Sequence, residues 1–195
     1  MPIKGPLDLL CQMAEILDEL EVPYALGGSM ASSLLGEPRT TIDVDMAVRL
    51  EGDAGEALLE RAGSLFYIPM GPARDAIRTH SSFNLIDTSN ALKVDLFVLG
   101  TGLLDRMQIE RRVLIPVPGA ARGIWVTAAE DQVLRKLDWF RQGGSLSDRQ
   151  WRDVVGILRI HHQSVDLDYL HASALEVGLS IEVADALRDA QEPLE

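Results

Sequence analysis

The stretch Ile42-Asp43-Val44-Asp45-Met46-Ala47-Val48 alternates, placing apolar side chains at its even positions and two aspartates opposite them. This period of two predicts a β-strand whose four large apolar side chains share one face. Asp43 and Asp45 then project together from the other face. Adjacent carboxylates repel each other unless water solvates both or a cation lies between them. The pattern predicts either a site for a hard cation such as Mg²⁺ or a solvated sheet face.

A glycine-rich turn precedes the paired aspartates, with thirteen residues between Ser29 and Asp43. Tyr24-Ala25-Leu26 is expected to form a short strand, and Gly27-Gly28-Ser29 connects it to a helix over Ser29 to Leu35, with Ser29 or Gly28 as the N-cap. Glycine lets the backbone approach a ligand closely, and the free amides at a helix N-terminus attract anions. The turn is therefore a candidate phosphate site, although such turns are more often only connections.

A third carboxylate lies downstream. Strands are predicted over Phe83 to Asp87 and Leu92 to Leu99, joined by a hairpin-like turn. In the second strand, Lys93 and Asp95 share one face with Phe97. If this strand pairs with residues 42–48, Asp95 completes a two-metal site together with Asp43 and Asp45.

The remaining elements suggest an α+β fold, a mixed sheet with flanking helices followed by a C-terminal helical region. The pattern predicts helices over 7–20 and 53–62, and strands over 113–117 and 124–126. From Thr127 only helices are expected. Capping boxes at Thr127 to Glu130 and Ser147 to Gln150 mark the first two, and two more are expected near 167–177 and 181–190. We therefore expect a catalytic domain over 1–126 and a helical region over 127–195.

Composition excludes several classes of protein. The chain has 195 residues, 47% of them hydrophobic, and a formal net charge of −12. This balance is typical of a folded globular protein and argues against a protein that coats DNA. Cys11 is the only cysteine, so a cysteine-rich zinc site is excluded. No apolar stretch has the length of a membrane span, and we expect a cytoplasmic protein.

The order of these motifs resembles the DNA polymerase β-type nucleotidyltransferases. Their signature is matched by Leu26-Gly27-Gly28-Ser29, Asp43-Val44-Asp45-Met46 and the strand Lys93-Val94-Asp95-Leu96, with the spacer between the first two at the upper limit. The stretches 39–45 and 130–137, followed by Asp148 and Asp153, are similar to the minimal and abortive-infection toxin-like members, the toxins of type IV toxin–antitoxin pairs. The resemblance extends over roughly residues 7–160.

The resemblance implies a role for each matching residue. Asp43, Asp45 and Asp95 would bind two Mg²⁺ ions, and Asp95 would help to deprotonate an attacking hydroxyl. The triphosphate would contact Gly28, Ser29 and Lys136, and also Arg39. For Arg39 the sequence favours a plain loop residue over this role, whereas Lys136 is equally compatible with a surface lysine.

The implied activity is Mg²⁺-dependent transfer of a nucleoside monophosphate from a nucleoside triphosphate (NTP) to a hydroxyl. The acceptor would be RNA, protein or a small molecule, and an antitoxin is a possible partner. One alternative is a non-catalytic nucleotide- or metal-binding member that acts through a protein partner. Another is a structural domain whose aspartates are merely solvated.

Overall fold

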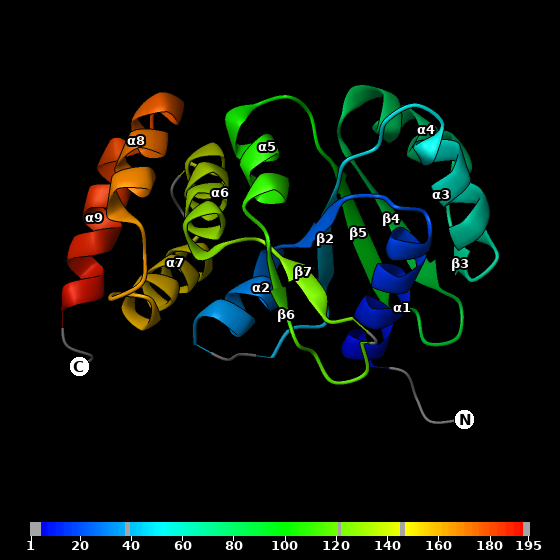
Figure 1. Cartoon of the computed structure of the whole chain (residues 1–195), viewed down its shortest axis with the longest axis horizontal. Helices are drawn as coiled ribbons and strands as arrows, with labels where there is room; N and C mark the ends of the chain where they lie inside the picture. Colours follow the sequence, from blue (N-terminus) through cyan, green and yellow to red (C-terminus); the bar gives the residue numbers. More distant parts are fainter. Residues whose placement is uncertain (1–4, 38–39, 121, 145–146, 193–195) are drawn as a thin grey trace.

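The computed structural model describes residues 5–37, 40–120, 122–144 and 147–192. Within these residues the strands form one mixed seven-stranded sheet in the order β3-β4-β5-β2-β1-β7-β6 (Figure 1). The strands are β1 Tyr24–Leu26, β2 Val44–Val48, β3 Phe66–Tyr67, β4 Ser82–Asp87, β5 Lys93–Val98, β6 Val113–Ile115 and β7 Ile124–Val126. The strands β2 and β5 are parallel neighbours in the centre of the sheet.

Helices accompany the sheet and follow it in the chain. Those within the first 126 residues are α1 Pro6–Glu19, α2 Gly28–Leu35, α3 Ala54–Gly63, α4 Met70–Thr79 and α5 Leu103–Glu110. Those after β7 are α6 Ala129–Gln142, α7 Asp148–Ile160, α8 Leu167–Val177 and α9 Ser180–Gln191. Figure 1 shows the C-terminal helices as a group beside the sheet. The α+β architecture expected from the sequence is confirmed.

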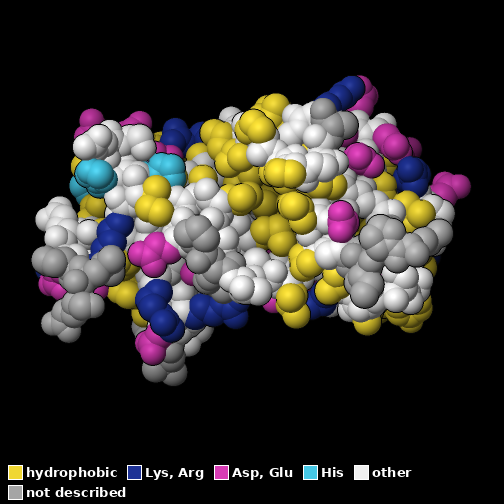
Figure 2. Space-filling model, turned by 90° about the horizontal axis from the view of Figure 1, so that it is seen from below, with side chains coloured by type: hydrophobic (Ala, Val, Ile, Leu, Met, Phe, Trp, Pro, Cys, Tyr) yellow, Lys and Arg dark blue, Asp and Glu magenta, His cyan; other side chains and the backbone are white. Residues whose placement is uncertain are grey.

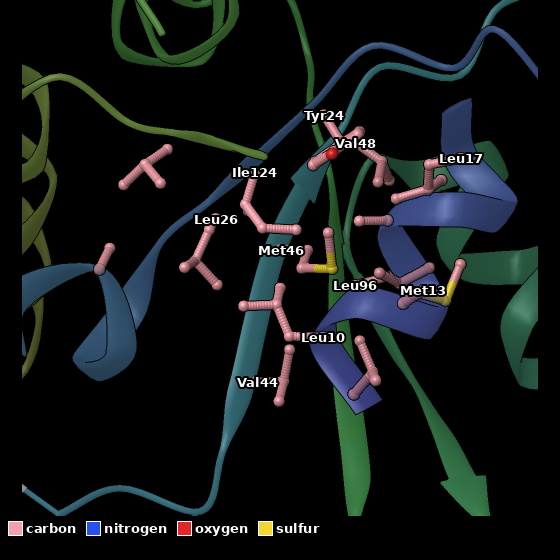
Figure 3. Close-up of a cluster of buried hydrophobic side chains, with 14 of the residues drawn as sticks. Leu10, Met13, Leu17, Tyr24, Leu26, Val44, Met46, Val48, Leu96 and Ile124 are labelled. Carbon is pink, nitrogen blue, oxygen red and sulfur yellow. The ribbon is translucent and has the colours of Figure 1, made fainter. Parts of the chain in front are cut away.

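The two faces of the central strands have different surroundings. Val44, Met46 and Val48 of β2 are buried and face α1, where Leu10, Met13 and Leu17 contribute to the same core (Figure 3). On the opposite face, Ala47 packs with Ala25, Leu99 and Ile109 in a second, smaller cluster. Asp45 alternates with Val44 and Met46, so it lies on this second face, toward α5 and α6.

The outer surface is uneven in character. Figure 2 shows hydrophobic side chains gathered near the middle of the face seen from below, with basic side chains toward the end that carries the C-terminal helices. None of the described helices has the length and apolar character that a membrane crossing needs.

The expected capping box at Thr127 is wrong. Helix α6 begins at Ala129 with Ala128 as its N-cap, and no side chain caps it. Glu130 instead accepts hydrogen bonds from Arg111 and from the backbone amide of Asp166. These distant partners compete successfully for the carboxylate that a local cap would use. At Ser147 only half of the expected box forms: the Ser147 hydroxyl accepts a hydrogen bond from the amide of Gln150, whereas the buried Oε1 of Gln150 meets no hydrogen-bond donor among the described residues.

Other differences concern short elements. The helix after the glycine turn begins at Gly28 with Gly27 as its N-cap, one residue before the expected start. Residues 42 and 43 precede β2 rather than belonging to it. The sequence also did not predict β3, α4 or α5.

Candidate active site

Asp45 and Asp95 are direct neighbours across the central strands. The parallel pairing of β2 and β5 sets Asp45 opposite Asp95, and the side chain of Lys93 lies on the same face. The Lys93 ammonium is 2.7 Å from Oδ2 of Asp95 and 3.9 Å from Oδ1 of Asp43. The structure therefore sets Asp45 beside Asp95 and places the Lys93 ammonium between the carboxylates of Asp95 and Asp43.

The glycine turn lies directly against this group. The amide of Gly27 donates a 2.8 Å hydrogen bond to the carbonyl oxygen of Asp45. Gly28 has a φ of +58°, and a Cβ atom at this residue would lie 1.9 Å from Oδ2 of Asp45. Only glycine fits both the positive φ and this close approach. The turn and the carboxylate thus form one structural unit.

The surroundings of Asp45 disfavour its charge. Burial raises the pKa of Asp45 above 3.8, and the neighbouring charges of Asp95 and Asp43 raise it further. A backbone hydrogen bond from Ser29 and the positive charge of Lys136 lower the pKa but do not cancel the rise. A cation bound beside Asp45 would stabilise the charged carboxylate and so offset both the cost of its burial and the repulsion by its neighbours.

The donor set is suited to Mg²⁺, which binds carboxylate oxygens. Among the described residues, the buried Oδ1 atom of Asp95 meets no hydrogen-bond donor, so it has unused capacity as a ligand. As the side chains stand, no group of three His, Cys, Asp or Glu residues in the described part of the chain is spaced to hold a metal ion. The ammonium of Lys93 lies between the carboxylates of Asp43 and Asp95 instead.

Lys136 reaches the site from the helical region, as expected, but it is not at the surface. Its ammonium lies 2.7 Å from Oδ2 of Asp153 on α7, and the two side chains are only 4% and 7% exposed. Both residues line a cavity of about 300 Å³ together with Ser29, Asp43 and Asp45. Lys136 is therefore half of a buried ion pair in the wall of this cavity.

Arg149 of α7 is a further basic residue of the same cavity. One of its guanidinium nitrogens lies 3.4 Å from the hydroxyl oxygen of Ser29. Sequence reasoning did not select it, because nothing in residues 147–153 indicates that this helix turn faces the glycine turn. Arg39, the other arginine considered from the sequence, lies outside the described residues.

Asp45 also lines a second cavity, of about 380 Å³. It shares Gly28, Asp45 and Trp139 with the first cavity. The rings of Phe97 and Trp139, which are 5.7 Å apart between centroids, both line it. Polar groups complete its wall, among them His80, Ser82, Arg135 and Gln142.

Gln132 of α6 supports the glycine turn and was not predicted. Its side-chain nitrogen donates to the carbonyl oxygen of Gly28 at 2.7 Å and lies 3.0 Å from the hydroxyl oxygen of Ser32. Gln132 is buried, with 1% exposure. The available signal was its position four residues before Lys136, which puts the two side chains on one face of the helix.

Comparison with known proteins finds similarity in structure only. No family model matches the sequence, and no curated protein matches it. An antigenic nucleotidyltransferase-like protein from Paracoccidioides brasiliensis is 19% identical, with a TM-score of 0.57; the match covers 95% of this chain and 93% of that one.

The antibiotic-resistance factor ANT(2'')-Ia is also similar. Its solution structure is 13% identical with a TM-score of 0.55, and the match covers 92% of this chain and 96% of that one. Its crystal structure with adenylyl-2''-tobramycin is 13% identical with a TM-score of 0.54, covering 91% and 98%. At these identities the similarity shows the fold. The chain has a nucleotidyltransferase-like fold.

Proposed function

We propose that this protein is a Mg²⁺-dependent nucleotidyltransferase that moves a nucleoside monophosphate from an NTP to a hydroxyl acceptor. One observation carries the proposal: the Gly28 turn contacts the Asp45 carboxylate, Asp45 lies opposite Asp95, and the cavity beside them also has Lys136 and Arg149 in its wall. If Asp45 belonged only to a solvated sheet face, by contrast, the fold would not require a glycine of positive φ in direct contact with its carboxylate.

The residues have separate roles in this proposal. Asp43, Asp45 and Asp95 would hold Mg²⁺, in a two-ion site, and the metal when bound neutralises and orients the phosphates. The amides at the start of α2 and the side chain of Arg149 bind the triphosphate. Asp95 accepts the proton of the attacking hydroxyl. The acceptor oxygen bonds to the α-phosphorus, the bond to the bridging oxygen breaks, and pyrophosphate leaves.

The two cavities supply separate places for two substrates. The triphosphate binds in the 300 Å³ cavity, whose wall includes Arg149 and the Lys136–Asp153 ion pair. The acceptor approaches from the 380 Å³ cavity, against Phe97 and Trp139. Asp45 lines both cavities, so a phosphate in one and a hydroxyl in the other would meet beside it. In this arrangement residues 1–126 supply the carboxylates and residues 127–195 close the nucleotide site.

A second part of the proposal concerns the acceptor and the biological setting of the reaction. The sequence resemblance favours a toxin of a toxin–antitoxin pair, with RNA or protein as acceptor and an antitoxin as partner. The fold is also that of ANT(2'')-Ia, whose crystal structure contains an adenylylated small molecule, and this favours a small acceptor. A non-catalytic nucleotide-binding member is favoured by the present spacing of the carboxylates, with Lys93 between them.

A labelling experiment tests the proposal. The protein is incubated with each α-³²P-labelled NTP and Mg²⁺, in separate reactions containing cellular RNA, protein or the small-molecule fraction. We expect label in one fraction with wild type and none with the Asp45→Asn variant. Absence of label in every fraction, with NTP binding retained, would support the non-catalytic alternative.

A further inference from the structure

Lys93 is placed where a cation ligated by Asp43 and Asp95 would bind. It precedes Asp95 by two residues on β5, and the alternation of the strand sets both side chains on one face. Its ammonium donates to Oδ2 of Asp95 at 2.7 Å and reaches Oδ1 of Asp43 at 3.9 Å. One positive charge of the chain itself therefore lies within ion-pair distance of two carboxylates of the candidate site.

The lysine is not locked in this position. Its side chain is 43% exposed, whereas that of Asp95 is 15% exposed. Lysine carries its charge on a flexible four-carbon stem, so the ammonium can leave Asp95 and remain hydrated. The carboxylate, which is held on a central strand, cannot follow it. Separating the pair thus frees a largely buried anion for another cation.

We infer that Lys93 is an internal competitor for the divalent cation: it occupies Asp43 and Asp95 in the cation-free protein and is displaced when the cation binds. Lys93 thereby sets the cation concentration at which the carboxylates become available as ligands. The inference rests on the cation site of the proposed function, but it concerns binding and not transfer. It distinguishes Lys93 from Lys136, whose ammonium is buried against Asp153.

Titration of the nucleotide-free protein with Mn²⁺ tests this inference. The electron paramagnetic resonance signal of the free ion measures how much Mn²⁺ remains unbound. A partly exposed ion pair contributes about 1 kcal/mol, and this free energy corresponds to about a fivefold change in the affinity for Mn²⁺. We expect Lys93→Gln to bind Mn²⁺ at least about fivefold more tightly than wild type. Lys93→Arg, which keeps the charge, is expected to bind no more tightly than wild type.

A matched control separates local competition from net charge. Arg188 forms an exposed ion pair with Asp185 on α9, and Arg188→Gln removes the same unit of charge. This variant is expected to bind Mn²⁺ with wild-type affinity. A double variant, Lys93→Gln with Asp95→Asn, is expected to lose the increase in Mn²⁺ affinity, because it lacks the Asp95 carboxylate for which Lys93 and the cation compete.

A second readout follows the lysine directly. The chain has three lysines, so protein labelled with ¹³C at the lysine ε-carbon gives three resolvable sites, and the spectrum of Lys93→Arg assigns one of them. We expect addition of Mg²⁺ to shift the Lys93 signal toward that of a hydrated lysine. This measurement is made on the wild-type protein, with Lys93→Arg used only for the assignment, and it decides the matter even if Lys93→Gln is unstable.

Three results would overturn the inference. One is equal or weaker Mn²⁺ binding by folded Lys93→Gln, and another is a Lys93 signal that does not respond to saturating Mg²⁺. The third is failure of all the proteins to bind Mn²⁺. None of these titrations contains nucleotide, so a failure of nucleotidyl transfer alone would leave their outcome unchanged.

Discussion

Gly28 and Asp45 are so close that a Cβ atom at residue 28 would lie 1.9 Å from Oδ2 of Asp45. Gly28 begins α2, whereas Asp45 lies on β2, and the amide of Gly27 hydrogen-bonds the Asp45 carbonyl oxygen at 2.8 Å. The backbone of the turn and the carboxylate therefore cannot move independently. A phosphate bound at the turn would lie beside the carboxylate that holds its cation.

Gly28→Ala is expected to disrupt this unit. The φ of +58° costs an alanine about 1–2 kcal/mol, and the added methyl group must also displace the Asp45 carboxylate. We expect a loss of at least about 2 kcal/mol in the free energy of unfolding and a loss of NTP binding. Urea denaturation and calorimetric titration with NTP measure the two effects.

Gly63→Ala is the matched control for this substitution. Gly63 is the last residue of α3, and nothing lies within 4 Å of a Cβ atom built there. The alanine is expected to stabilise the protein slightly, by up to about 1 kcal/mol. Similar behaviour of the two alanine variants would contradict the close contact at Gly28.

Asp45→Asn is expected to lower the rate of nucleotidyl transfer by about 100-fold or more. It is also expected to stabilise the cation-free protein at neutral pH. Burial and the charges of Asp95 and Asp43 raise the pKa of Asp45, so the folded protein binds this proton more tightly than the unfolded chain. Wild-type stability therefore falls as the pH rises from 3.8 through the raised pKa. The amide has no such proton to lose.

Thermal unfolding against pH, without divalent cations, measures this effect. The stability gained by Asp45→Asn over wild type is expected to be complete above the raised pKa and to fade as the pH falls toward 3.8. A variant less stable than wild type at pH 7 would show that Asp45 stabilises the fold and is not a strained site residue.

Lys136 and Asp153 are expected to depend on each other. Their buried side chains lie 2.7 Å apart, and loss of one partner leaves the other charge buried. Lys136→Met is expected to cost about 3–5 kcal/mol, much of which the double variant with Asp153→Leu should restore. If Lys136 also binds phosphate, the double variant will recover stability but keep a raised KM for NTP. A wild-type KM in the double variant would assign Lys136 to packing alone.

Gln132→Ala removes the hydrogen bonds that hold the glycine turn to α6. Two polar groups, the Gly28 carbonyl and the Ser32 hydroxyl, lose a buried donor, so a loss of about 1–3 kcal/mol is expected together with weaker NTP binding. Gln142→Ala provides the comparison for stability. That exposed side chain hydrogen-bonds Asp138 on the same helix, and its loss should cost less than about 0.5 kcal/mol.

The sequence predicted the elements whose signals are local. The alternation of residues 42–48 and the glycine turn identified β2 and the start of α2 to within two residues. By contrast, α4 buries only Ala73 and Ala76, and α5 buries Gln108 and Ile109, so neither shows a large apolar stripe. The two residues of β3 are too few for a detectable period.

The site was predictable as a set of residues but not as a set of contacts. Asp43, Asp45 and Asp95 were identified from alternation and resemblance, whereas the register that sets Asp45 opposite Asp95 joins positions fifty residues apart. The partners of Lys93, Lys136 and Gln132 depend on such long-range packing. The error at Thr127 has the same origin, since Arg111 and the Asp166 amide bind the Glu130 carboxylate.

Binding of a non-hydrolysable α,β-methylene NTP, measured by calorimetric titration with and without Mg²⁺, tests most directly that the glycine turn and the three aspartates form one nucleotide site. We expect wild type to bind one analogue much more tightly with Mg²⁺ than without it, and Asp45→Asn and Asp95→Asn to lose this difference. Equal affinity with and without Mg²⁺, or Mg²⁺-dependent binding that survives both substitutions, would contradict the account.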